Sequence, residues 1–562
     1  MLTRVVIPVC HALWLLSCLP GWLRFHVALR HPRQAQQHLL KRLLRKNRHS
    51  VFGKRHKFAE IHSAREFVAA IPLSDYEAFS PAVFTAQTGG PFDLSIDRPH
   101  LLEPTSGSTG TPKLIPVTRA SLKAFKAGLD PWIASLYFAH PALLFGRHYW
   151  AITPNTPTAA GVDAPNAIPT GFSDDADYLG RAGRLIARHL LAVPQDLCRV
   201  SEPEWFTRLT LLFLARSNNL RLMSVWHPSF LTLLLDALPE HLPEIILALR
   251  SGKLPGERAL AAPLYARLAS GFKADVRRAD ELTTLVPTTD AEVLAYRIWP
   301  KMRIISCWTG PRMEPALKVL CRHFPGVIIQ PKGLLATEGC ISVPTGDGSR
   351  HPCALNAHYL EFYDPQTERV LPLHDVRLGQ IYSVVLTTDA GLWRYRLHDL
   401  VRVSDYYHAT PCLTFIGKDN AVSDLVGEKL DERHACEALE TASDKTGFRP
   451  TFCMMVPARW QTASASGYLV ALDGATSRHI KDSVILAWTE AVESELKKNY
   501  HYAHARRLGQ LVPLRPVRIQ NALHTYTRIR QSEGVRSGTL KIPALSFSEA
   551  FAAHVCSAAR VP

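Results

Sequence analysis

The segment Thr105–Lys113 (TSGSTGTPK) combines hydroxyl side chains, two glycines and one lysine within nine residues. Glycines let a backbone approach a ligand closely. Hydroxyls and exposed backbone N–H groups can surround an anion, and Lys113 adds a positive charge. This chemistry suits the phosphates of a nucleotide, although a Ser/Gly-rich turn can also be a plain loop. The spacing differs from G-x-x-x-x-G-K-[ST], so the segment is not an ordinary P-loop.

Two further segments carry carboxylates at positions where α/β sheets bind ligands. Gln330–Gly339 (QPKGLLATEG) places Thr337 and Glu338 just past a predicted strand end. Gly391–Val401 (GLWRYRLHDLV) places Asp399 after a strand rich in aromatic and basic residues. A carboxylate at that place can accept hydrogen bonds from both hydroxyls of a ribose.

The elements that must position these residues follow from periodicity. Apolar residues recur on one face after Thr118, which predicts a helix with Thr118 as its N-cap. Residues 35–70 are predicted to be helical, with a turn at Ser50–Gly53. Met302–Trp308 and Gly326–Gln330 predict buried strands joined by a helix over 314–324, a β-α-β pattern typical of a mostly parallel sheet.

The length of 562 residues predicts more than one domain. We expect an α/β fold class: a large domain, 1–417, with mostly parallel sheets flanked by helices, and a small, mobile α+β domain, 425–562. A polar, charged hinge at 418–424 would join them. A strand over 467–473 and a helix ending near Asn499 support the second domain.

The net charge of +16 is concentrated at one end of the chain. Residues 1–59 contain twelve Lys and Arg side chains and no acid, and the rest is nearly balanced, so nucleic acid is not an expected partner of the core. Eleven cysteines without a C-x-x-C pair argue against disulfides or zinc and favour a reducing, cytoplasmic location.

The mostly apolar stretch Val5–Leu23 leaves three alternatives open. It can be a helix that docks on the body of the protein, a contact with an anionic membrane surface, or a cleaved or spanning segment. Pro8, His11 and Pro20 weaken a spanning helix. The second alternative would place the protein peripherally at the inner face of the membrane.

Taken in order, the motifs resemble those of the Gretchen Hagen family, the acyl acid–amido synthetases among the adenylate-forming enzymes. The long matching stretches are 45–79, 221–238, IWPKMRIISCWTG, QPKGLLATEG and SGTLKIPAL. The chain is similar to bacterial-type rather than plant members. The resemblance implies a fold like that of firefly luciferase, with ATP and Mg²⁺ as cofactors and with a small carboxylic acid and an amine, typically an amino acid, as substrates.

The resemblance also implies roles for individual residues. Thr337 and Glu338 would lie beside the α-phosphate and the magnesium ion, with Glu338 as the metal ligand and a catalytic residue, and Asp399 would hold the ribose. Lys429, in GEKLDE of the hinge region, and Lys541, in TLKIP, would be catalytic lysines, with Lys429 closer to the family pattern. The residues expected to hold the triphosphate are Ser106, Ser108, Thr109 and Lys113.

Two departures from the family pattern stand out. This chain has LLATE where plant members have Y-A-S-S-E, so the packing around adenine must differ. It has YRLHD where the family has Y-R-x-G-D, which places His398 at a glycine position. His398 can touch the ribose or magnesium region, or it can be an ordinary packed or exposed histidine.

Three readings of function remain open at this level. The chain can be an ATP-dependent ligase that forms an amide through an acyl-AMP intermediate. It can instead transfer the acyl group to a thiol such as coenzyme A, or to another acceptor. It can also be a degenerate, non-catalytic member that binds a membrane or partner. The acid is not identified, although Trp150, Trp226 and Trp308 are candidates for its pocket.

Overall fold

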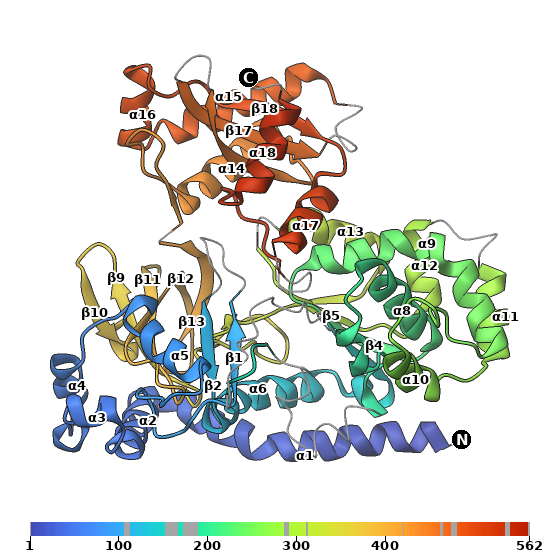
Figure 1. Cartoon of the computed structure of the whole chain (residues 1–562), viewed down its shortest axis with the longest axis horizontal. Coiled ribbons are helices and arrows are strands. Elements are labelled where there is room, and N and C mark those ends of the chain that lie inside the picture. Colours follow the sequence, from blue (N-terminus) through green and yellow to red (C-terminus); the bar gives the residue numbers. More distant parts are fainter. Residues whose placement is uncertain are drawn as a thin grey trace.

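The structure is a computed structural model of the chain. The residues that it describes are 2–105, 113–151, 167–171, 189–285, 291–310, 313–419, 421–460, 465–473, 480–533, 535 and 540–559. In Figure 1 the blue, green and yellow elements form a broad body, and the orange and red elements of the C-terminal part lie above it.

Four short strands form a parallel sheet in the order β3-β4-β5-β6. The helix α13 (Glu314–His323) joins β5 to β6, which confirms the predicted β-α-β unit. The expectation that both strands are buried was wrong for β6, because it lies at the edge of the sheet and its Ile328 is exposed. Leucine-rich helices pack with this sheet in one apolar core. The elements are β3 (Arg147–Trp150), β4 (Leu220–Ser224), β5 (Ile304–Cys307), β6 (Ile328–Pro331), α8 (Pro203–Arg216), α9 (Pro228–Ser251), α10 (Ala262–Ser270), α11 (Val276–Leu285) and α12 (Ala291–Ile298).

The larger sheet has five strands in the order β10-β9-β11-β12-β13 and is antiparallel throughout. The expectation of parallel strands therefore holds for the four-stranded sheet alone. Short connections explain the antiparallel pairing. Only His408 and Ala409 join β12 to β13, whereas parallel neighbours need a long crossover. The strands are β9 (Tyr359–Asp364), β10 (Arg369–Pro372), β11 (Ile381–Thr387), β12 (Tyr395–Tyr407) and β13 (Thr410–Lys418).

Two small hairpins present the sequence motifs. β1 (Leu101–Pro104) and β2 (Leu114–Val117) are antiparallel and flank the glycine-rich segment. β7 (Leu335–Ala336) and β8 (Gly339–Cys340) form the second hairpin. The helix α6 (Arg119–Ala139) follows β2. Thr118 is its N-cap and forms a capping box with Ser121, as the sequence predicted.

The N-terminal helix α1 (Leu2–Arg30) docks on the body of the protein. Buried His11 hydrogen-bonds through Nδ1 to the Tyr137 hydroxyl at 2.6 Å and through Nε2 to the Gly146 carbonyl at 2.8 Å. Gly21 allows a close approach, since a Cβ there would lie 2.7 Å from Cβ of Asp130 in α6. Within the described residues, Val5–Arg30 is long and apolar enough to cross a membrane. These contacts agree with the docking alternative.

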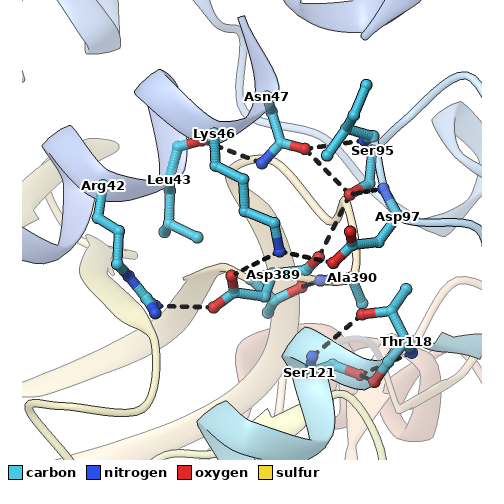
Figure 2. A network of polar contacts seen from close by, with 12 residues as sticks. Arg42, Leu43, Lys46, Asn47, Ser95, Asp97, Thr118, Ser121, Asp389 and Ala390 are labelled. Atoms are coloured by element: carbon cyan, nitrogen blue, oxygen red, sulfur yellow. Dashed lines mark hydrogen bonds and ion pairs between the residues drawn. The ribbon is translucent and has the colours of Figure 1, made fainter.

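The helix α2 (Pro32–Asn47) is fastened to the body by two of its basic side chains. Arg42 and Lys46 both pair with the carboxylate of Asp389, at 2.8 and 3.5 Å, and only 2% of that side chain is exposed. Asn47 accepts a hydrogen bond from Ser95, and Figure 2 shows these residues converging. Part of the basic N-terminal charge is therefore structural.

The prediction of helix over 35–70 was too simple. The helix α2 ends at Asn47. Ser50 is the N-cap of the next helix, because its side chain accepts a hydrogen bond from the N–H of Gly53. The segment is thus divided among short elements. They are the end of α2, α3 (Val51–Arg55), η1 (Phe58–Glu60) and α4 (Ala64–Ala70), and η2 (Tyr76–Ala78) and α5 (Ser80–Gln87) follow them.

Among the described residues, the C-terminal part has two apolar cores whose buried members begin at Leu430, and Leu425 and Val426 pack against the first. Its sheet has the order β16-β17-β18, with β16 antiparallel and β18 parallel to β17. This mixed arrangement is consistent with the predicted α+β character, while the boundaries at 417 and 425 stay a prediction. The elements are β14 (Val422–Ser423), β15 (Leu430–Asp431), α14 (Glu432–Thr446), β16 (Cys453–Trp460), β17 (Ala465–Asp473), α15 (Asp482–Leu496), α16 (Tyr500–Arg507), β18 (Arg515–Ile519), α17 (Ala522–Ser532) and α18 (Glu549–Ala558).

Candidate functional site

Asp399 is a buried carboxylate that can accept further hydrogen bonds. It lies within β12, rather than after a strand as the sequence suggested, and is 2% exposed. The strand register places it opposite Lys418 of β13, whose Nζ lies 2.9 Å from Oδ1. The Lys418 ammonium occupies one acceptor position at Oδ1, whereas an ionised carboxylate has about four, so an oxygen of Asp399 can still accept a further hydrogen bond. Such an oxygen fits a ligand hydroxyl.

Thr337 and Glu338 are the two residues that connect β7 to β8. Thr337 is exposed, whereas the Glu338 carboxylate receives the Tyr395 hydroxyl at 3.3 Å on Oε1. Burial raises the pKa of Glu338, and the charges of Lys418 and Lys113 oppose that rise. The hairpin therefore presents a carboxylate among cations.

The described end of the glycine-rich segment faces the same place. Lys113 Nζ lies 5.5 Å from the Tyr76 ring centroid and 5.9 Å from that of Tyr395. The Tyr395 hydroxyl is the one that contacts Glu338, so Lys113 is close to the carboxylates. The predicted phosphate ligands Ser106, Ser108 and Thr109 lie outside the described residues.

Lys541 comes to this site from the C-terminal part of the chain. Its Nζ lies 5.4 Å from the ring centroid of Trp308 and 5.7 Å from that of Phe415. Burial lowers the pKa of Lys541, while the charges of Asp399 and Glu338 act in the opposite direction. The late lysine therefore lies where the charges of the two carboxylates act on it, while its catalytic role stays a prediction.

Lys429 is placed differently from Lys541. Its side chain is exposed and its backbone is left-handed, with φ of 44°. The cations that act on Glu338 and Asp399 are instead Lys113, Lys418 and Lys541. A catalytic role of Lys429 stays a prediction, and it would require another arrangement of the C-terminal part.

Lys418 was missed as a site residue by the sequence reasoning. It appeared there only as the start of the hinge. The signal that identifies it is strand pairing, because the residue opposite a functional side chain in an antiparallel pair lies next to it. Burial and the Asp399 charge act in opposite directions on Lys418, and the net result is a raised pKa. Lys418 therefore stays a cation at the site.

A cluster of tryptophans surrounds a second missed lysine. Lys332, after β6, donates to Ser224 Oγ at 2.7 Å and lies 5.0 Å from the ring centroids of both Trp132 and Trp226. Burial lowers its pKa to about 8. Trp226 contacts Trp308 at 5.7 Å, which links Lys332 to the ring beside Lys541. The cluster lies at the carboxyl ends of β4, β5 and β6, where α/β sheets bind ligands.

The residues present fit the nucleotide and its metal in chemical type. Three lysines can offset the charge of a triphosphate, and the Asp399 oxygen can accept from ribose. In the described part of the chain, no three His, Cys, Asp or Glu side chains gather as a metal site. Mg²⁺ does not need such a cage, because it is commonly held by one carboxylate, waters and the substrate's phosphates.

Comparison with known proteins decides the family. A model described as the GH3 family N-terminal domain matches residues 23–329, and one described as the GH3 family central domain matches 352–418. The first match alone covers more than half of the chain. The chain belongs to the GH3 family. This confirms the resemblance to the Gretchen Hagen family.

Named relatives of this GH3 chain are plant amido synthetases. Indole-3-acetic acid-amido synthetase GH3.15 of Arabidopsis thaliana is 25% identical over 440 residues, covering 73% of this chain and 72% of the relative. A second, GH3.4 of the same plant, is 22% identical over 432 residues, covering 74% of this chain and 72% of the relative. The solved structure of AtGH3.15 acyl acid amido synthetase with 2,4-DB has a TM-score of 0.81 at 18% identity, over 97% of this chain and 96% of that one. The GH3 fold is therefore established over 97% of the chain.

Proposed function

We propose that this GH3 chain is an ATP-dependent acyl acid–amido synthetase, that is, a ligase that forms an amide through an acyl-AMP intermediate. The observation that carries the proposal is the meeting of Lys541 from the C-terminal part with Asp399, Glu338 and Lys418. A divided site of this kind suits a reaction in two steps. The names of its relatives, amido synthetases, support the same reaction.

In the first step the acid's carboxylate oxygen attacks the α-phosphorus of ATP, and pyrophosphate leaves. Two anions must approach each other, so positive charges fixed in advance lower the barrier most. Lys113 and Lys541 would supply those charges, while Asp399 would orient the ribose. Magnesium, held by Glu338 and the phosphates, would add further charge compensation.

In the second step the amine nitrogen attacks the carbonyl carbon of the acyl-adenylate. The C–N bond forms, AMP leaves and the nitrogen loses a proton. Water must be kept away from the adenylate meanwhile, and a closing domain can do this. We infer that residues 425–562 move between the steps about a hinge at 418–424, which removes Lys541 and brings another face, including Lys429, to the adenylate.

The acid is best identified by a screen for pyrophosphate release over aromatic, jasmonate-like and fatty acids. Indole-3-acetic acid and 2,4-DB start the screen because they occur in the names of the relatives. Acceptors are then compared, with amino acids and coenzyme A supplied in parallel. Amide formation supports the proposal. Thioester formation supports the alternative, and a folded protein that does not bind Mg-ATP supports the non-catalytic reading.

We also propose that the outer face of α1 contacts an anionic membrane surface. The side of α1 turned away from α6 carries a row of exposed apolar residues, and no acid occurs before Glu60. This combination suits anionic lipid. The row consists of Val5, Val9, Leu13, Leu16, Leu23 and Val27.

Co-sedimentation with vesicles containing phosphatidylserine tests this second proposal. The full chain should sediment at low salt, and a chain lacking residues 1–24 should do so much less while still binding ATP. If the full chain stays in the supernatant, the membrane proposal is wrong. If the shortened chain is insoluble, α1 serves the docking role that its buried His11 indicates.

A further inference from the structure

His398 occupies a backbone conformation that suits glycine. Its φ is 64°, in the left-handed region, which few residues other than glycine adopt and where histidine is one of the better tolerated side chains. This explains why the family pattern has glycine at this position of YRLHD. A side chain held there against a conformational preference points to a role for its contacts.

Both ring nitrogens of His398 face carboxylates. Nδ1 lies 2.5 Å from Asp419 Oδ1, and Nε2 lies 2.7 Å from Asp75 Oδ1. Only the imidazolium can donate from both nitrogens at once. Arg396 donates to the other oxygen of Asp419 at 2.6 Å, and the Asp419 N–H donates to the His398 carbonyl at 3.0 Å.

These contacts fix a carboxylate, that of Asp419, which is also buried. Only 13% of its side chain is exposed. Burial acts to raise the pKa of Asp419, but the hydrogen bonds from His398 and Arg396 prevail and lower it. Asp419 is therefore a buried carboxylate held by two side chains of β12, His398 and Arg396.

The bridge joins two parts of the nucleotide site. Asp419 directly follows Lys418, which pairs with Asp399. Asp75 directly precedes Tyr76, whose ring faces Lys113. His398 thus connects the first residues of the hinge to the segment beside the glycine-rich loop.

We propose that His398 is a positioning residue that fixes Asp419 in the arrangement in which Lys418 and Lys541 face Asp399. The bridge confines rotation of the C-terminal part to residues after 419. It thereby favours the adenylating arrangement over the one that serves amide formation. This role rests on the proposed two-step function, whereas the fixing of Asp419 does not.

Hydrogen exchange and separated half-reactions test the bridge. H398G keeps a residue that accepts positive φ and removes only the imidazole. H408G is the matched control, because exposed His408 also has positive φ, 55°, and lies at the far end of the same strand pair. H398N is the conservative variant, since asparagine also tolerates this backbone and can donate to Asp419.

In H398G the amides of 413–425 should exchange at least tenfold faster, with adenylation slowed about tenfold and aminolysis of supplied acyl-adenylate not slowed. H398N should recover part of both effects, and H408G should match the wild type. Unchanged exchange in folded H398G overturns the proposal, whatever the activity. Equal slowing of both half-reactions also overturns it, because it indicates a general structural role. If exchange rises but wild-type protein adenylates no acid, the proposed function fails while the bridge stands.

Discussion

Replacing Asp399 by asparagine separates its charge from its shape. The carboxylate lies 2.9 Å from Lys418 Nζ, which corresponds to an attraction of about 6 kcal/mol at an effective dielectric constant of about 20, before desolvation is subtracted. The net cost of breaking a buried pair is about 3–5 kcal/mol, and of an exposed pair about 0–1. Since 21% of the Lys418 side chain is exposed, we expect an intermediate loss of unfolding free energy.

D399N should also weaken nucleotide binding in the protein that remains folded. A hydrogen bond to a charged acceptor contributes about 1.5–3 kcal/mol. Loss of that contribution raises the Kd of ATP by roughly 10- to 150-fold. The alanine variant D399A should bind ATP at least as weakly, because it also leaves Lys418 without its partner. Isothermal calorimetry with a non-hydrolysable ATP analogue and Mg²⁺ measures the change.

A matched control lies on the same strand. Asp405 of β12 pairs with Arg350 at 2.6 Å, and about half of each side chain is exposed. D405N therefore removes an ion pair from β12 without touching the site, and it should leave ATP affinity unchanged. A folded D399N protein with the ATP affinity of the wild type would refute the ribose assignment.

Three further predictions concern the lysines and the pH dependence. K541M should slow adenylation at least tenfold more than aminolysis of supplied acyl-adenylate, in rapid-quench assays. K429M should instead slow aminolysis more than adenylation, because the proposed movement brings Lys429 to the adenylate in the second step, and wild-type rates for both half-reactions in K429M contradict a catalytic role of Lys429. The adenylation rate should rise with pH through the pKa of Glu338, which is raised above 4.5, because the carboxylate is the active form. At higher pH the rate should fall through the pKa of Lys541, which is lowered below 10.5, because the ammonium is the active form. A rate unchanged from pH 5 to pH 10 argues against both roles. K332M should change the relative kcat/KM for different acids more than the Kd of ATP, since Lys332 lies in the tryptophan cluster beside Trp226; unaltered acid preference would make Lys332 a structural cation.

The sequence was most informative where chemistry and local structure coincide. The N-cap of α6 was predicted because a threonine before an amphipathic run has a local physical cause. The β5-α13-β6 unit was predicted because two short apolar runs flank a helical stretch; β5 is a buried parallel strand, whereas Ile328 of β6 is exposed at the sheet edge. Thr337 and Glu338 were located by motif, although their hairpin was not foreseen.

The remaining features depend on contacts between distant segments. The partner of Asp399 is fixed by the register of β12 and β13, which periodicity alone does not determine. The His398 bridge joins residues 323 positions apart in sequence, so no local pattern indicates it. Lys332 resembles any lysine after a strand until the fold places Trp132 and Trp226 against it. Long-range geometry supplied what composition and spacing lacked.

The central claim is that an acid is activated as an acyl-adenylate and then becomes an amide. An isotope transfer experiment tests it most directly, with an ¹⁸O-labelled carboxylic acid from the screen, ATP and an amino acid. Attack by the carboxylate on the α-phosphorus leaves one labelled oxygen on the phosphate of AMP when the amine displaces it. We predict amide and AMP in equal amounts, with one ¹⁸O in each AMP. Label in inorganic phosphate with formation of ADP, or a thioester in place of the amide, would contradict the account.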